Sequence, residues 1–282
     1  MKFSKEELKQ NIKLAAFDVD GTILPYKQKT FSNEIVGMFR KLQENNIITT
    51  LATAREMVSI GNLLKDAKYL DYFIGANGMF VYDVKHEKFV YEKKFDRETV
   101  KLLYDALSKN NLSSGFTICD TEYIYYGPGT YLETWFLTPF KDKLKPYDID
   151  AIDNDHLYII TVNCKNRDET DRCEAIINEL IKEQNLPVEI NSKWYKGLFI
   201  QPIGVNKAST LHWLSEYLNL NSQKQLIAFG DSDNDIHMLQ EAGYSVAMGN
   251  ADDYIQAYAD DVAPHVEENG AYIKLQDLGL IG

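Results

Sequence analysis

The sequence predicts an α/β protein in which a doubly wound, mostly parallel sheet is interrupted by an inserted α+β domain. Mostly apolar runs such as 12–19 indicate strands that are buried on both faces. These runs alternate with segments of helical periodicity, which favours parallel pairing with right-handed crossovers. After residue 78 the pattern changes to short strands that pair around polar turns.

The first part of the chain supplies the opening strands of the sheet. Strands are expected at 12–19, 47–52 and 72–74. Ser32 is a candidate cap for a helix whose apolar residues from Ile35 to Leu42 recur at helical spacing, and a second helix is expected at 57–64.

The middle of the chain indicates an antiparallel module, and the last part returns to the parallel pattern. In the middle, strands are expected at 79–83, 89–93, 116–119, 123–126 and 156–164, and helices at 96–109 and 172–182. Further on we expect helices at 206–218 and 233–241, strands at 226–229 and 246–248, and one or two small helices in the tail. The predicted division is therefore 1–83 with 196–282 as one domain and 84–195 as the insertion.

Length and composition exclude several classes of protein. A chain of 282 residues favours about two domains, at roughly 150 residues per domain. With 45% hydrophobic and 26% charged residues it resembles an average globular protein, not a disordered or low-complexity chain. The formal net charge of −12 disfavours nucleic acid as a partner, because an acidic surface repels a phosphate backbone.

Cysteine usage and apolar run lengths bear on location. The three cysteines, Cys119, Cys164 and Cys173, form no C-x-x-C pair, so neither a disulfide framework nor a zinc site is predicted, and all three are expected to behave as small apolar residues. The charged N-terminus lacks a signal-peptide core, and no uncharged apolar run approaches the ~18 residues of a membrane span. We therefore expect a cytoplasmic protein with no membrane partner, either a monomer or a small homo-oligomer.

Two acidic clusters follow predicted strands. Asp18 and Asp20, with Gly21 behind them, end the first strand, and Asp231 and Asp235 follow the strand at 226–229. In open α/β sheets, ligands bind outside the carboxyl ends of the strands. Carboxylates that converge there need a cation to remain ionised, and oxygen ligands suit Mg²⁺. The sequence therefore predicts a magnesium site.

Residues suited to phosphate accompany the acidic clusters. Lys207 begins a predicted helix, and Thr53 ends the second strand. A carboxylate nucleophile, Mg²⁺, a lysine and a hydroxyl donor together have the chemistry of phosphoryl transfer.

These motifs, in this order, resemble the haloacid dehalogenase superfamily of phosphohydrolases, and within it the Cof-type sugar-phosphate phosphatases with a large inserted cap. The matching segments are 18–24, 52–55, 75–78, 204–207 and 230–239, spread over nearly the whole chain. Ala54 stands where the family usually has glycine. The resemblance implies a Rossmann-like catalytic core with an α+β cap, and a Mg²⁺-dependent phosphatase that acts on a small phosphorylated metabolite through an aspartyl-phosphate.

The resemblance also implies a role for each matching residue. Asp18 is the expected nucleophile and Asp20 the acid and base. The expected ligands of Mg²⁺ are Asp18, the backbone carbonyl of Asp20 and Asp231, with Asp235 behind them. The expected phosphate contacts are Lys207, the Thr53 hydroxyl, the backbone N–H groups of Val19 and Ala54, and Asn234.

Two residues and two other functions stay open at this point. Arg55 is either a phosphate contact or the partner of a nearby acid, and Asn77 is either a turn residue or a polar contact at the floor of the site. The same nucleophile would also serve a phosphomutase or phosphotransferase. A non-catalytic regulatory module that binds Mg²⁺ and phosphate is a further alternative, although Asp20 and the large cap argue against it.

Overall fold

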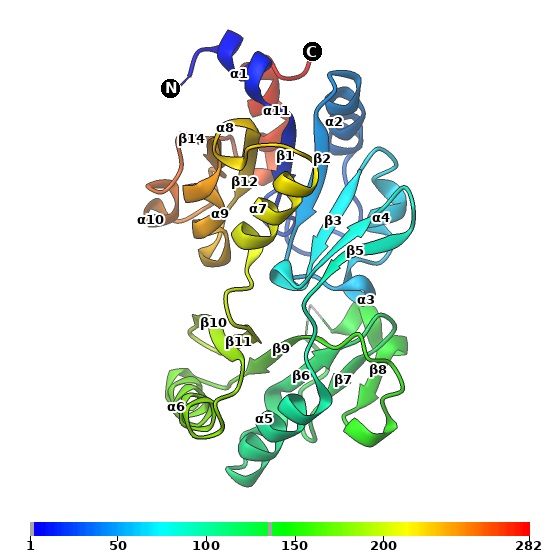
Figure 1. Ribbon diagram of the computed structural model, residues 1–282, viewed down its shortest axis with the longest axis vertical. Coiled ribbons are helices and arrows are strands. Elements are labelled where there is room, and N and C mark those ends of the chain that lie inside the picture. Colours follow the sequence, from blue (N-terminus) through cyan, green and yellow to red (C-terminus); the bar gives the residue numbers. More distant parts are fainter. Residues whose placement is uncertain (1–2, 135–136) are drawn as a thin grey trace. The chain divides into compact units, whose positions relative to one another are not determined.

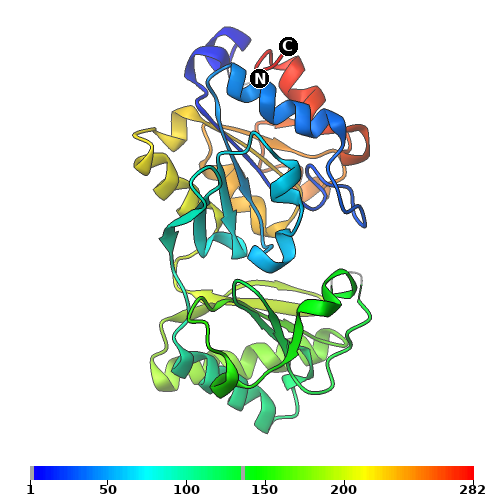
Figure 2. The same cartoon turned by 90° about the vertical axis from the view of Figure 1, so that its right-hand side faces the viewer.

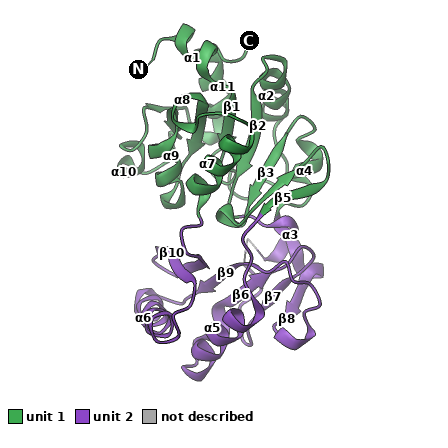
Figure 3. Cartoon of the chain, in the orientation of Figure 1, with its two compact units in different colours: residues 1–54, 60–91, 206–282 green, residues 55–59, 92–205 purple. Residues whose placement is uncertain are grey.

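The structure is a computed structural model that describes residues 3–134 and 137–282 (Figure 1). The chain divides into two compact units (Figure 3). The core unit comprises residues 1–54, 60–91 and 206–282, and the inserted unit comprises Arg55–Ser59 and Glu92–Val205. The longer segment of the inserted unit begins and ends further along the chain than the range 84–195 expected from the sequence, and the short segment Arg55–Ser59 was not expected in this unit.

An eight-stranded sheet, in the order β14-β13-β12-β1-β2-β3-β4-β5, forms the centre of the core unit. β1 (Leu14–Phe17) lies between β12 (Leu226–Gly230) and β2 (Ile48–Ala52) and is parallel to both. The other strands are β3 (Tyr72–Gly75), β4 (Phe80–Asp83), β5 (Lys88–Glu92), β13 (Tyr244–Ala247) and β14 (Asp261–Val262). Only β4 and β5 lie beyond the parallel part, with β4 antiparallel to β3.

Helices cover both faces of this sheet, which explains why β1 is apolar throughout. Leu14 and Ala16 pack into one apolar cluster with Leu211 of helix α7 (Lys207–Tyr217). On the opposite face Phe17 packs edge-to-face against Phe39 of α2 (Asn33–Glu44), at 5.9 Å between ring centroids. Helices α2 and α11 (Gly270–Asp277) lie side by side in Figure 2. The predicted doubly wound α/β fold is confirmed.

Most predicted elements of the core unit are present, and one is wrong. Ser32 caps α2 by accepting the backbone N–H of Ile35, as expected. The helix expected at 57–64 is two separate turns, α3 (Met57–Ile60) and α4 (Leu63–Asp66), because Gly61 between them has a φ of +51°. The remaining helices are α1 (Lys5–Asn11), α8 (Ser222–Gln225), α9 (Ile236–Glu241) and α10 (Asp253–Gln256).

The inserted unit is an α+β module built on a six-stranded sheet in the order β10-β11-β9-β6-β7-β8. Two long helices, α5 (Arg97–Lys109) and α6 (Arg167–Gln184), pack on each other. The strands are β6 (Phe116–Cys119), β7 (Ile124–Tyr126), β8 (Leu144–Pro146), β9 (Tyr158–Asn163), β10 (Val188–Trp194) and β11 (Gly197–Pro202). The hairpin of β10 and β11 was not predicted, because a register shift between Ile190 and Ser192 breaks the alternation of β10.

Candidate active site

The parallel sheet brings the chemically important loops together. Asp18 follows β1, Thr53 follows β2 and Asp231 follows β12, and these three strands are adjacent. Their registers place Phe17 opposite both Leu51 and Phe229. The three loops therefore leave the sheet at the same edge, where open α/β sheets bind ligands.

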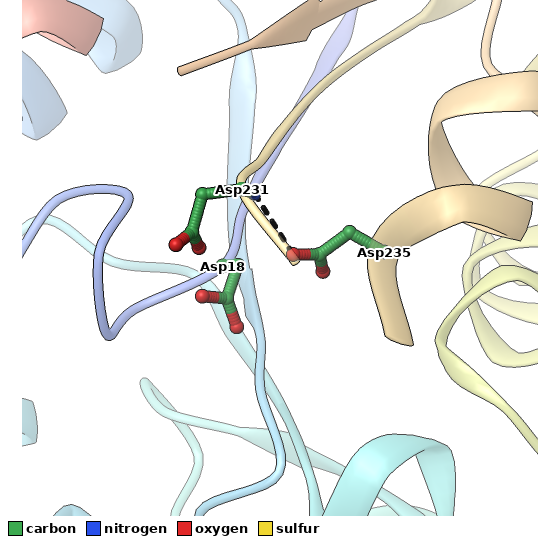
Figure 4. Close-up of side chains that lie close together, drawn as sticks. All are labelled: Asp18, Asp231 and Asp235. Atoms are coloured by element: carbon green, nitrogen blue, oxygen red, sulfur yellow. Dashed lines mark hydrogen bonds between the residues drawn. The ribbon is translucent and has the colours of Figure 1, made fainter. Parts of the chain in front are cut away.

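Three buried carboxylates meet at this edge. Asp18, Asp231 and Asp235 each offer an oxygen atom, and these atoms all lie within 4.8 Å of one another. Figure 4 shows Asp18 beside Asp231, with Asp235 approaching from the start of α9. Residues more than 200 positions apart in the chain thus form one acidic cluster, as the sequence predicts.

Lys207 is the cation of the cluster. It is the first residue of α7 and is completely buried, and its Nζ donates to Asp18 Oδ1 at 2.6 Å and to Asp235 Oδ1 at 2.8 Å. Asn206, just before it, caps the helix by accepting the backbone N–H of Ser209 at 2.9 Å. The cap fixes the point where α7 begins and, with it, the direction of the lysine side chain.

Burial and like charge shift the acidity of these groups. Burial raises the pKa of Asp18 well above its ordinary value, against the opposing charge of Lys207. Burial, followed by the charge of Asp235, raises the pKa of Asp231 to about 7. Burial alone would lower the pKa of Lys207, but the carboxylates of Asp18 and Asp235 outweigh it and the pKa is raised. The lysine therefore remains charged while the carboxylates compete for protons.

Asp231 and Asp235 also accept hydrogen bonds from neutral donors. Asp235 Oδ2 accepts the backbone N–H groups of Asp231 at 3.0 Å and Ser232 at 3.1 Å. Asp231 accepts the Thr22 hydroxyl at 3.0 Å and the Tyr26 hydroxyl at 3.2 Å. Sequence reasoning gave no role to Thr22, although it stands in the first motif, and no sequence signal indicates Tyr26.

The loop after β1 is a tight turn built on Gly21. The carbonyl oxygen of Val19 accepts the N–H groups of Thr22, Ile23 and Leu24. Gly21 has a φ of +86°, and a Cβ added there would lie 2.2 Å from Asp231 Oδ2. Only glycine fits both the left-handed backbone and this close approach.

A chain of polar contacts joins the second, third and fifth motifs. Asn234 Nδ2 donates to Asn77 Oδ1 at 3.2 Å, and the Asn77 backbone N–H donates to the Thr53 carbonyl at 2.8 Å. Asn77 is buried and has a φ of +56°. Asn77 is therefore a turn residue that is also buried and bonded to Asn234, and a contact with substrate at the floor of the site stays a prediction. Thr53 is buried as well.

The remaining predicted residues occupy different positions. Val19 and the half-buried Asp20 lie on the turn after β1, and Ala54 is the last residue of its core segment. Arg55 is grouped with the inserted unit, and its Nη1 donates to the Ser59 carbonyl at 2.8 Å. The structure therefore gathers Asp18, Asp231, Asp235 and Lys207 directly, and a phosphate contact by Arg55 stays a prediction.

The cluster fits a divalent cation. Three carboxylates beside one ammonium leave an excess of two negative charges in a buried space when all are ionised. Burial is the largest cause of the raised pKa values of Asp18 and Asp231, and the neighbouring carboxylates raise them further. An ion with two positive charges would balance the excess negative charge, and the oxygen-only donor set suits a hard cation.

The chain belongs to the haloacid dehalogenase-like hydrolase family, whose model matches residues 15–275. A 5-amino-6-(5-phospho-D-ribitylamino)uracil phosphatase, YcsE, of Bacillus subtilis is 26% identical over 267 residues, which cover 92% of this chain and 93% of the relative. An HMP-PP phosphatase of Serratia proteamaculans is 27% identical, over 85% of this chain and 84% of its own length.

A solved structure shares the fold. The crystal structure of a haloacid dehalogenase-like hydrolase from Bacteroides thetaiotaomicron superposes with a TM-score of 0.81 at 23% identity, over 95% of this chain and 99% of the other.

The comparisons confirm the family resemblance and the enzyme class. The chain is a hydrolase of the Cof type within its superfamily and acts as a phosphoric monoester hydrolase, as predicted. In residues 3–134 and 137–282 there is no helix whose length and apolarity would let it cross a membrane.

Proposed function

We propose that this protein is a Mg²⁺-dependent phosphatase that hydrolyses a small phosphorylated metabolite through an aspartyl-phosphate on Asp18. The observation that carries the proposal is the position of Asp18, a buried carboxylate at a strand end, in hydrogen-bond contact with Lys207 and next to Asp231. A carboxylate nucleophile needs such a setting, because an ionised phosphate ester otherwise repels it.

In the proposed reaction Asp18 attacks phosphorus in line with the leaving oxygen. Asp20, two residues further along the same turn, protonates that oxygen and later takes a proton from the attacking water. Lys207 holds Asp18 by its Oδ1 atom and contributes positive charge to the transferring group. The hydroxyl of Thr53, the N–H groups of Val19 and Ala54, and Asn234 are the proposed neutral contacts of the phosphate.

The proposed ligands of Mg²⁺ are Asp18, the backbone carbonyl of Asp20 and Asp231, with Asp235 behind them. When bound, Mg²⁺ offsets the repulsion between the nucleophile and the ester. Within the chain itself, Thr22 and Tyr26 orient Asp231, and two backbone N–H groups orient Asp235. These contacts fix the carboxylates before a ligand arrives, which reduces the cost of assembling the site.

We propose that the substrate is a sugar phosphate or a similar phosphomonoester. Support comes from the two relatives named for phosphatase activity on 5-amino-6-(5-phospho-D-ribitylamino)uracil and HMP-PP. For the location, we propose the cytoplasm, whose reducing conditions suit a chain with three free cysteines.

A screen for released phosphate tests the proposal. Purified protein is incubated with phosphorylated sugars, nucleotides and cofactor precursors, including the compounds named for the relatives, with MgCl₂ or with EDTA. We expect free phosphate from at least one monoester and loss of that release in EDTA. Product isomers without free phosphate would instead indicate the phosphomutase alternative.

Asp18→Asn tests the nucleophile. We expect kcat to fall on the order of a thousandfold or more, because an amide cannot form the acyl-phosphate. Asp105→Asn, on the surface of α5 and paired with Lys101, is the matched control and should retain wild-type activity. Circular dichroism checks that both variants fold, and undiminished activity of folded Asp18→Asn would eliminate the proposed mechanism.

A further inference from the structure

Two cysteines of the inserted unit lie next to each other. Cys164 directly follows β9, and Cys173 lies on the buried face of α6, nine residues further along the chain. Their sulfur atoms are 3.8 Å apart, within hydrogen-bond distance. The sequence predicts no disulfide framework, and all three cysteines are free thiols in the structure; the contact between two of them was not predicted.

The local backbone holds the two thiols in place. The N–H of Cys164 donates to the Lys196 carbonyl at 2.8 Å, which ties the end of β9 to the turn between β10 and β11. The Thr170 hydroxyl, one turn before Cys173, donates to the Tyr195 carbonyl at 3.2 Å in the same turn. The end of β9 and helix α6 are therefore both bonded to the turn between β10 and β11, and this packing brings the two sulfur atoms together.

The environments of the two thiols differ in exposure and in acidity. Cys164 is partly exposed, whereas Cys173 is fully buried. The hydrogen bond between the two sulfur atoms, with help from Thr170, lowers the pKa of Cys164, while the same hydrogen bond and burial raise the pKa of Cys173. The thiolate is the nucleophilic form of cysteine, so Cys164 is the more reactive of the two.

The third cysteine provides an internal comparison. Cys119, at the end of β6, is buried, and burial together with the nearby Glu56 carboxylate raises its pKa well above the ordinary value. Its surroundings oppose thiolate formation, so it should be inert under conditions in which Cys164 reacts.

We propose that Cys164 and Cys173 are a reversible dithiol–disulfide site, with Cys164 as the attacking thiol and Cys173 as the resolving thiol. The site lies wholly within the inserted unit, and it depends on neither the metal site nor the proposed phosphatase activity.

The reaction balances with a low-molecular-weight disulfide as the oxidant. The Cys164 thiolate attacks one sulfur of that disulfide, whose S–S bond breaks and releases a first thiolate, which takes up a proton. Cys173 then loses its proton and attacks Cys164 Sγ, which releases the second small thiol and closes the protein disulfide. The oxidant is reduced to two thiols, and the two cysteines are oxidised. A disulfide requires sulfur atoms about 2 Å apart, so side-chain rotation must close the remaining separation.

The test uses the full-length protein and oxidised glutathione. The folded protein is incubated with an excess of oxidised glutathione, quenched with an alkylating reagent under denaturing conditions and mapped by mass spectrometry. We expect a linked peptide pair that contains residues 164 and 173, alkylated Cys119, and full reversal by a reducing agent. In brief alkylation of the reduced folded protein, Cys164 should react at least about tenfold faster than either other cysteine.

Three single variants separate the roles. In Cys173→Ser the glutathione adduct on Cys164 should persist, because the resolving thiol is absent. Cys164→Ser should gain neither adduct nor disulfide, and Cys119→Ala should behave as the wild type. A persistent adduct on Cys164 of the wild-type protein, a disulfide that includes Cys119, or three free thiols after prolonged incubation would each overturn the proposal.

Discussion

At the residue scale, the contacts of Lys207 organise the acidic cluster. Its ammonium group touches Asp18 and Asp235, while Asp231 depends on hydroxyl donors. Two of the three carboxylates thus have a fixed positive partner, and the third has a pKa raised to about 7. A bound cation would therefore favour the ionised form of Asp231.

The turn at Gly21 is the residue-scale feature that is easiest to break. In Gly21→Ala the new methyl group would overlap Asp231 Oδ2, and the φ of +86° would add a strain of about 1–2 kcal/mol. We expect phosphatase activity to fall more than about tenfold, because Asp231 must move. Steady-state kinetics measures the loss of activity, and thermal unfolding measures the loss of stability.

Gly37→Ala in α2 is the matched control for that substitution. A Cβ at this position meets no atom within 4 Å. Alanine is the better helix former, by about 1 kcal/mol, so this variant should be as stable as the wild type or more stable, with unchanged activity. Equal activity of both alanine variants would contradict the proposed importance of the turn.

At the scale of the elements, the start of α7 determines where Lys207 lies. Asn206 and Ser209 form a reciprocal capping pair: each side chain accepts the backbone N–H of the other residue. The backbone of Asn206 also approaches Gly78, where an added Cβ would lie 2.4 Å from the Asn206 carbonyl oxygen. The helix start is thus held against the loop that carries Asn77.

Asn206→Ala tests this element. Loss of the cap should lower the free energy of unfolding by about 1 kcal/mol. It should also lower kcat/KM, because the first turn of α7 would fray and Lys207 would lose its fixed direction. Denaturant unfolding and steady-state kinetics are the two measurements.

Asn166→Ala is the control at the same scale. Asn166 caps α6 by the same type of contact, with the Glu169 N–H at 2.9 Å, but it lies in the inserted unit. A similar loss of stability with nearly wild-type activity is expected. If both variants lost activity equally, general destabilisation would explain the effect and the specific role of the α7 start would be wrong.

At the scale of the whole molecule, the chain enters the inserted unit twice. Besides the long insertion 92–205, the short segment Arg55–Ser59 groups with that unit, where Val58 packs with Cys119, Ile124 and Leu137. This segment follows Thr53 and Ala54 directly. The proposed phosphate-binding residues are thus covalently continuous with a segment that packs in the other unit.

The acidic cluster should make the stability of the whole protein depend on Mg²⁺ and pH together. In the metal-free fold Asp231 keeps its proton up to about pH 7, whereas its ordinary pKa is 3.8. Its contribution to stability is therefore present below about pH 4 and is lost as the pH rises through 7. Because a cation binds the ionised carboxylates, we expect Mg²⁺ to raise the unfolding temperature strongly at pH 8 and weakly at pH 5.

Thermal unfolding with and without MgCl₂ at the two pH values measures this dependence. Asp231→Asn should abolish most of the Mg²⁺ effect at pH 8, while Asp105→Asn should preserve it. Equal stabilisation by Mg²⁺ at pH 5 and pH 8 would show that proton release from the cluster does not accompany binding.

Much of the fold and the site could be predicted from the sequence because the signals are local. The apolar run before Asp18 can be satisfied only by a strand covered on both faces, and Ser32 and Asn206 mark helix starts by their side-chain chemistry. Each acidic cluster follows a strand of the parallel sheet, so both clusters are expected at the same edge of that sheet. The broken helix at Gly61 and the shifted register of β10 escaped prediction, because each depends on backbone conformation.

The amino-acid sequence by itself determined the order of the motifs along the chain, the charge of the site and the family to which the chain belongs. Only the tertiary structure decided that Thr22 and Tyr26 hold Asp231, that Arg55–Ser59 packs in the inserted unit, and that Cys164 meets Cys173. The physical reason is that these contacts join side chains from separate elements. Their distances are set by how helices and loops pack, and no spacing along the chain encodes them.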